Sequence, residues 1–224
     1  MTKKSVNKSA MADWKSVYDG KEPLETFLER NRPSQIDTEA EWIYVENEQH
    51  RLELENEDKE EKKRRDSTMS AMETEWEGLE RECMYRRSKK FTAETLKNLA
   101  VKYKFTSGKW MIFASREQID DLWFTVAKAV VANKLGHVAD VSTTKTPETD
   151  HVICTFTKDF TDENDVQRVK KGLRDVGIQV ALKYKPDVYT ELGIYSRNTL
   201  CIPVVIYYSQ AVQNGSNESI KKWR

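Results

Sequence analysis

The sequence has little cysteine, glycine and proline, and each shortage excludes a class of protein. Its 224 residues include only 3 Cys, 8 Gly and 5 Pro. The cysteines, Cys83, Cys154 and Cys201, are odd in number, lie far apart and never form a C-x-x-C pair. This pattern argues against a disulfide framework and against a thiolate metal site. We therefore expect a reducing compartment, cytoplasmic or nuclear, and no metal or other cofactor.

The sequence also has no excess of positive or negative charge and no long apolar run. The chain has 37 Lys+Arg and 37 Asp+Glu, so no overall positive field favours nucleic acid or an anionic membrane. The best apolar run, Cys201 to Tyr208, has eight residues with Pro203 inside it, well short of the roughly 18 that a membrane span needs. We expect no membrane association, and any nucleic-acid binding must come from a local patch.

Sequence motifs of catalysis are absent as well. The three histidines, His50, His137 and His151, do not have the spacing of a zinc site, and neither G-x-S-x-G nor a P-loop occurs. Cys154 and His151 lie three residues apart on an expected strand, so their side chains point to opposite faces and cannot act together. We predict that the protein is not an enzyme.

Composition divides the chain into one domain and two tails. We expect residues 1–20 to be a disordered tail, 21–210 to be a single domain, and 211–224 to be a C-terminal tail. From Glu46 to Asp66 there are nine acidic and six basic residues, and only Leu52 and Leu54 are apolar. The domain should therefore contain a charged mobile insertion over 46–68, although an exposed helix is the alternative there.

Hydrophobic spacing predicts the elements of the first half. Leu24, Phe27 and Leu28 share one face of a short helix, Pro23 to Arg30. A strand is expected at Glu41 to Val45, because Trp42-Ile43-Tyr44-Val45 is aromatic and β-branched. Two amphipathic helices should follow, over Ala71 to Arg87 and around 96–103.

In the second half, boundary signals accompany the periodicity. Ser115 and Gln118 have capping-box spacing before a long apolar helix, Asp162 can cap a second helix, and Gly177 can end it. The expected strands are Lys109 to Ala114, Val138 to Ser142, His151 to Thr157, Val180 to Tyr184 and Cys201 to Tyr208. Helices follow strands irregularly, which predicts an α+β fold: a curved, largely antiparallel sheet with helices packed on one face.

Several strings of residues resemble known families. Ser107 to Phe113, followed by Asp120-Asp121-Leu122-Trp123 at the start of an apolar helix, resembles the central part of the translation initiation factor 4E fold. A closer similarity is to the uncharacterised basophilic-leukaemia-expressed-protein family. Its signatures are Phe27-Leu28 before Arg32-Pro33-Ser34, Gly108-Lys109-Trp110, and Lys185 to Thr190 with Leu192 to Tyr195.

The resemblance implies a 4E-like sheet whose concave face, in 4E proteins, holds a methylated guanine between two Trp rings. This chain departs from that pattern. Leu99 and Ala100 stand where the 4E pattern has a Trp-Glu pair, and Asp140-Val141-Ser142-Thr143 stands where it has a phosphate-binding Arg.

Candidate ligand-binding residues come from aromatic and basic side chains. Trp42 and Tyr44 share a strand face and could stack on bases, with burial under the helices as the equal alternative. Trp110 and Trp123 follow the periods of their elements and should pack in the core. The phosphate or RNA candidates are Lys183, Lys185, Tyr189, Arg197 and Lys145. The plain alternative for the first four is an irregular strand whose Lys-Pro-Asp turn is held by Asp187 bonding to nearby backbone N–H groups.

Two further residues have regulatory or structural interpretations. Ser67 ends the R-R-x-S string preferred by basophilic kinases, whereas the plain interpretation is a solvated charged segment. Arg32 should fix the chain after its helix through bonds to carbonyl groups, with a phosphate contact as the alternative.

Our leading hypothesis is a non-catalytic 4E-like monomer that binds RNA or a nucleotide phosphate. The alternative is a protein-interaction module with a vestigial pocket, docking a partner through Ala71 to Arg87 or through the last edge strand.

Overall fold

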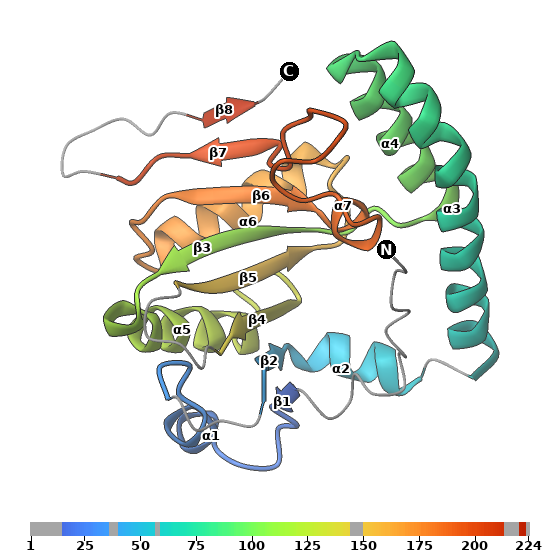
Figure 1. Ribbon diagram of the computed structural model, residues 1–224. Coiled ribbons are helices and arrows are strands. Elements are labelled where there is room, and N and C mark those ends of the chain that lie inside the picture. Colours follow the sequence, from blue (N-terminus) through green and yellow to red (C-terminus); the bar gives the residue numbers. More distant parts are fainter. Residues whose placement is uncertain (1–14, 36–39, 57–58, 144–149, 213–219, 223–224) are drawn as a thin grey trace.

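An eight-stranded sheet forms the centre of the molecule in a computed structural model, which describes residues 15–35, 40–56, 59–143, 150–212 and 220–222. The strands lie in the order β1-β2-β4-β5-β3-β6-β7-β8 (Figure 1). In chain order they are β1 Lys15–Val17, β2 Trp42–Glu46, β3 Gly108–Ala114, β4 Val138–Ser142, β5 His151–Thr157, β6 Leu182–Pro186, β7 Tyr207–Ser209 and β8 Ile220–Lys222. Among the strand pairs of the described residues, only β1–β2 is parallel. The prediction of an α+β fold with a largely antiparallel sheet is confirmed.

Helices cover the sheet unequally. Helices α5 (Arg116–Val131) and α6 (Glu163–Asp175) lie behind it in Figure 1, and α3 (Lys59–Arg86) and α4 (Lys89–Tyr103) form a long pair at one end. The short helices are α1 Leu24–Arg30, α2 Glu48–Glu55 and α7 Asp187–Glu191. No helix within the described ranges combines the length and hydropathy that crossing a bilayer requires.

Strand alternation sorts the side chains into two sets. Trp110 and Ile112 of β3, which are fully buried, point toward α5 and α6 together with Ile43 and Ile153. Trp123 of α5 is equally buried, and the Trp110 indole N–H donates to the Val166 carbonyl of α6 at 2.9 Å. The prediction that both tryptophans belong to the core is confirmed.

Two helix starts differ in how they are capped. Asp162 caps α6 as predicted, because its side chain accepts from the backbone N–H groups of Asn164 and Asp165. The capping box predicted at Ser115 does not form: the Ser115 hydroxyl donates to the Glu117 carboxylate at 2.6 Å instead of capping the helix. Gly177 follows α6 with a φ of 96°, in agreement with its predicted place at the helix end.

The charged segment is helical. Where a mobile insertion was expected over 46–68, α2 and the first turns of α3 occupy most of the chain, so the exposed-helix alternative holds. Helix α2 buries no residue, and its start is capped by Asn47, which accepts from His50 N–H at 2.8 Å. In α3, Met69, Met72 and Trp76 anchor the later turns in the core, and helix propagation from an anchored segment requires no further burial.

The N-terminal prediction also needs correction. Residues 1–14 lie outside the described part of the chain, but Lys15–Val17, predicted to be disordered, forms β1 beside β2. Tyr18 N–H donates to the Tyr44 carbonyl at 3.0 Å, and the Tyr18 ring contacts Phe27 of α1 at 5.3 Å between centroids. The local composition does not predict a strand here, but hydrogen bonding to β2, which is distant in sequence, orders this segment.

The C-terminal region differs most from prediction. The strand expected over Cys201 to Tyr208 is reduced to β7, because Pro203 offers no N–H and Cys201 has a φ of 55°. The Asn198 side chain satisfies this irregular backbone: its amide donates to the Tyr195 and Ile202 carbonyls, and its oxygen accepts from Ile202 N–H. Strand β6 lies two residues later than expected, and β8 forms within the segment expected to be a tail.

Candidate ligand-binding cavity

A cavity of about 700 Å³ lies on the sheet face opposite α5 and α6, which we call the cavity face. The strand periodicity that points Trp110 into the core points Lys109, Met111 and Phe113 of β3 the other way. Helix α7 and Met69 of α3 complete the enclosure. The lining residues are Lys15, Trp42, Met69, Phe105, Ser107, Lys109, Met111, Phe113, Asp140, Val152, Cys154, Phe156, Lys185, Asp187, Thr190, Glu191, Tyr195, Ser196 and Val204. Nine of these residues are aromatic or aliphatic, and six are charged: Lys15, Lys109, Asp140, Lys185, Asp187 and Glu191.

Two lysines lie side by side across β3 and β6, because Lys109 pairs with Lys185 in the strand register. The Lys109 ammonium lies 2.8 Å from the Asp187 carboxylate, and both side chains are 16% exposed. Burial is the largest single influence and lowers the pKa of Lys109, but the charge and hydrogen bond of Asp187, together with Cys154 and Asp140, outweigh it and the pKa is raised. Lys109 is therefore a fixed, neutralised cation.

Lys185 has a different environment. It is only 5% exposed, and its ammonium lies 4.1 Å from the centroid of the Tyr195 ring. No carboxylate among the described residues lies within ion-pair distance of it. Burial, followed by repulsion from Lys109, lowers its pKa to about 8. A buried amine without a counterion is costly to fold, which makes this residue a candidate for ligand contact.

Asp140 of β4 is the cavity's buried acid. It is 9% exposed, and its Oδ1 has no hydrogen-bond partner among the described residues. Burial raises the pKa of Asp140 to about 6, against the opposing charges of Lys109 and Lys15. The pKa of the neighbouring Cys154 thiol is raised by burial and by Asp140. The Thr190 hydroxyl of α7 is also buried without a partner in the described structure. The cavity thus offers an acceptor and a hydroxyl to a bound molecule.

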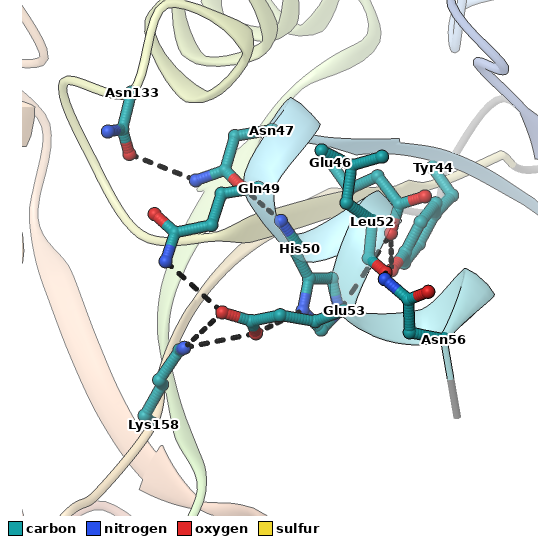
Figure 2. A network of polar contacts seen from close by, with 10 residues as sticks. All are labelled: Tyr44, Glu46, Asn47, Gln49, His50, Leu52, Glu53, Asn56, Asn133 and Lys158. Carbon is teal, nitrogen blue, oxygen red and sulfur yellow. Dashed lines mark hydrogen bonds and ion pairs between the residues drawn. The ribbon is translucent and has the colours of Figure 1, made fainter. Parts of the chain in front are cut away.

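The structure gathers only part of the predicted ligand set. Lys185 and Trp42 line the cavity. Tyr44 shares the face of Trp42, as predicted for alternate strand residues, but its hydroxyl donates to Glu46 at 3.1 Å, outside the cavity. This contact is visible in Figure 2.

The remaining candidates lie elsewhere. Lys183 is exposed on β6, 4.9 Å from the Phe113 ring centroid. Tyr189 is buried, and burial raises its pKa to about 12. Arg197 is exposed in the irregular segment after α7, and Lys145 lies outside the described residues. The compact basic cluster predicted from the sequence is therefore spread over a wider region.

Sequence reasoning missed Lys109, Asp140 and Asp187 as cavity residues. The signal was available for Lys109: a strand that buries Trp110 must turn Lys109 to the opposite face. Asp187 was expected to hold a turn through backbone N–H groups, but it pairs with Lys109 instead. Nothing local distinguishes Asp140, because its burial arises from strands that are distant in sequence.

Two other predicted residues have structural positions. Asp120, near the start of α5, accepts from the N–H and hydroxyl of Ser34, and Arg32 lies 3.7 Å from the same carboxylate. These contacts fix the segment after α1, although through a carboxylate. Ser67 is exposed on α3, and its hydroxyl donates to the Arg64 carbonyl at 2.8 Å, so the segment predicted to be mobile presents this serine on a helix.

A second, polar cavity of about 470 Å³ lies beside α2. Figure 2 shows the network next to it: Asn47 donates to Asn133 at 3.0 Å, and Lys158 lies 3.2 Å from Glu53. The His137 ring, 4.6 Å from the His50 ring, has a pKa lowered to about 4 by burial and then by His50. Within the described ranges, no group of three His, Cys, Asp or Glu is arranged to hold a metal. These contacts tie α2 to the segment between α5 and β4 and to the residue that follows β5.

Solved structures of cap-binding proteins show partial similarity to this chain. Ascaris suum eIF4E-3 is similar in its complexes with the m2,2,7G cap and with the m7G cap, each at 13% identity and a TM-score of 0.31. These matches cover 36% of this chain and 51% of the other. C. elegans eIF4E-3, in complex with the 4E-binding protein Mextli and a cap analog, is similar at 16% identity, with a TM-score of 0.33 and coverages of 42% and 56%. The chain thus spans about half the length of the structures it matches.

The family comparison covers most of the chain. The model of the basophilic leukemia-expressed protein Bles03 family matches residues 2–193, which include β1 to β6, all seven helices and most of the cavity lining. The strings around Arg32 and Gly108 and the string Lys185 to Thr190, which first indicated this family, fall within the match, and Leu192 to Tyr195 spans its end. The protein therefore belongs to the Bles03 family.

Proposed function

We propose that the cavity binds a nucleotide phosphate or a short segment of single-stranded RNA, without catalysing a reaction on it. The observation that carries the proposal is Lys185, a buried amine with no carboxylate partner among the described residues and with a cavity in front of it. A phosphate oxygen supplies the counterion that the fold does not. Phosphate contacts of this kind provide much of the affinity of proteins for nucleic acids.

Aromatic side chains complement the amine. Trp42, Phe156 and Tyr195 line the same space, and base stacking on aromatic rings stabilises single-stranded nucleic acids by about 1–3 kcal/mol per base. The cavity volume lies within the roughly 300–1,000 Å³ typical of small-molecule sites. Asp140 Oδ1 and the Thr190 hydroxyl can bond the polar edge of a base or a ribose. A nucleotide therefore satisfies each unpartnered group that we identify in the cavity.

The charge balance limits the electrostatic contribution. Lys15, Lys109 and Lys185 are matched by three acidic lining residues, Asp140, Asp187 and Glu191. Because only one or two phosphates can be neutralised, the logarithm of the binding constant should fall with a slope of about −0.7 to −1.4 against the logarithm of salt concentration. A steep slope would indicate a basic surface elsewhere on the chain.

Calorimetric titration of the purified protein with guanosine triphosphate, a methylated cap dinucleotide and a short single-stranded RNA tests the proposal. Lys185→Met should weaken binding at least tenfold, because the phosphate loses its cation while the side chain keeps its approximate size. Lys183→Met is the matched control: this exposed lysine lies two residues away on the same face, and binding should stay within twofold. No heat of binding with any of the three, or equal losses in both variants, would overturn the proposal.

Tryptophan fluorescence locates the ligand. Trp42 lines the cavity, whereas Trp76, Trp110 and Trp123 are buried in the core. A stacked base should quench the emission of the wild type, and Trp42→Phe should remove most of that quenching while calorimetry still detects binding. Quenching that survives in Trp42→Phe would place the ligand elsewhere.

A second candidate function, protein interaction, is favoured by one surface. Tyr85 and Met84, near the end of α3, are 89% and 40% exposed, and exposed aromatic side chains are frequent anchors of protein interfaces. A photo-crosslinking amino acid at position 85 tests this function in cells. A discrete protein adduct that persists after ribonuclease treatment would support it, and the lack of any adduct would contradict it.

A further inference from the structure

The Lys185 amine combines three features of a reactive lysine. It is buried, it faces a cavity large enough for a small molecule, and its immediate neighbours are another lysine and an aromatic ring rather than a carboxylate. Amines act as nucleophiles only without their proton, and an apolar site next to a second cation favours that form. Lys183, on the same strand and face, is exposed and lacks this enclosure.

We infer that Lys185 is a covalent site for carbonyl compounds: its Nζ condenses with an aldehyde that carries an aromatic ring and an anionic group. The inference uses the cavity but does not depend on nucleotide binding, because the group that reacts is the amine itself and the partner is a carbonyl carbon.

The reaction balances without an oxidant or a reductant. The Nζ lone pair attacks the carbonyl carbon, and a proton moves from nitrogen to the carbonyl oxygen to give a carbinolamine. Loss of the hydroxyl group with one more proton releases water and leaves an imine between Lys185 and the aldehyde carbon. The adduct is reversible, since water can hydrolyse it again.

The charged groups around Lys185 come from several elements. Lys109 of β3 repels the ammonium form, while Asp187 of α7 favours it but is held 2.8 Å from Lys109. Cys154 of β5 and Asp140 of β4 line the same cavity, as do Glu191 of α7 and Lys15 of β1. Burial and Lys109 prevail, so the pKa of Lys185 is lowered to about 8.

This environment sets the expected reactivity. At pH 7 an amine with a pKa of about 8 is roughly 10% neutral, whereas an ordinary lysine with a pKa of about 10.4 is less than about 0.1% neutral. The amine of Lys185 should therefore react on the order of 100-fold faster than an ordinary exposed lysine at this pH.

The chemical class of the aldehyde follows from the side chains that line the cavity around Lys185. Phe156 and Tyr195 suit a planar ring, and Lys109, although paired with Asp187, can donate an ammonium N–H to an anionic substituent. Pyridoxal 5′-phosphate has an aldehyde, an aromatic ring and a phosphate, and it serves as a probe of the site. Pyridoxal without the phosphate tests the contribution of the anion.

The experiment is labelling of the full chain at pH 7 with substoichiometric pyridoxal 5′-phosphate, reduction of imines with sodium borohydride, and peptide mass mapping. We expect the reduced adduct predominantly on Lys185, slower labelling by pyridoxal, and labelling that rises with pH through a midpoint near 8 and levels off about one pH unit higher. Labelling spread over many lysines, or concentrated on Lys183, would overturn the inference.

Variants separate reactivity from folding. Lys185→Arg keeps the charge but removes the nucleophile, so the main adduct should disappear, whereas Lys183→Arg should leave labelling of Lys185 unchanged. Lys185→Met provides a second test if the larger arginine disturbs the fold, and its circular dichroism reports whether it is folded. An adduct of undiminished yield in a folded Lys185 variant would contradict the inference.

The two proposals fail in different ways. Nucleotide binding without selective labelling would overturn the reactive lysine alone, and selective labelling without nucleotide binding would overturn the nucleotide proposal alone. If both hold, bound guanosine triphosphate should protect Lys185 from the aldehyde, because the phosphate stabilises the protonated amine and occupies the same space.

Discussion

The two faces of the sheet differ in packing and in charge. Behind the sheet, Trp110, Ile112 and Trp123 are fully buried between strands and helices, and the Trp110 indole N–H is hydrogen-bonded to α6. On the cavity face, Met111 of the same strand borders open space together with two lysines and a buried acid. Such charged groups lower stability unless something binds them. The residues behind the sheet therefore stabilise the fold, whereas the charged residues of the cavity face lower its stability.

Strand β3 offers the sharpest test of this difference. Trp110→Ala should lower the free energy of unfolding by about 3–5 kcal/mol, because it leaves a large void in a packed core. Met111→Ala, one residue away, should cost less than about 1.5 kcal/mol, because its side chain already borders a cavity. Urea denaturation of both variants measures the gap, and equal losses would mean that the cavity face is packed as tightly as the core.

Asp140 should make the stability of the protein depend on pH. Its pKa of about 6 in the folded protein lies above the unfolded value of about 3.9. The folded state therefore binds more protons between these values, and this carboxyl group disfavours folding increasingly as the pH rises through 6.

Asp140→Asn should accordingly stabilise the protein by about 1–3 kcal/mol at pH 8, and the gain should vanish near pH 4, where both side chains are neutral. Denaturation midpoints at pH 8, 6 and 4 check this expectation, with the exposed-site variant Lys183→Met as the control that should show no such trend. A gain that is independent of pH would mean that the Asp140 carboxylate is not the destabilising group.

The same division explains what the sequence could predict. The core elements follow from local patterns: the periods of β3, α5 and α6 and the Asp162 cap specify each element within a few residues, and the string at Lys185 indicates the family. Order that depends on distant partners was missed. Lys15–Val17 becomes a strand only because β2 lies beside it, and the segment around Pro203 is held by the Asn198 side chain rather than by a regular ladder.

The cavity was predictable in part. Trp42 and Lys185 were identified because an aromatic strand face and a string of basic residues can be recognised from the sequence alone. The ion pair of Lys109 with Asp187 and the burial of Asp140 were not, since each joins elements far apart in the chain. We grouped Lys183, Lys185 and Arg197 because they are close in sequence. In the structure Lys185 is buried and the other two are exposed, and this burial is what distinguishes Lys185.

Lys183 provides the smallest expected effect and the finest comparison. Its ammonium contacts the exposed Phe113 ring at 4.9 Å, and substitutions at exposed sites usually change stability by less than about 0.5 kcal/mol. Lys183→Met should therefore leave both the denaturation midpoint and the nucleotide affinity within error of the wild type. A loss of affinity equal to that of Lys185→Met, without loss of stability, would extend the site along β6 toward the exposed basic residues, and burial would then no longer be what selects the ligand contact.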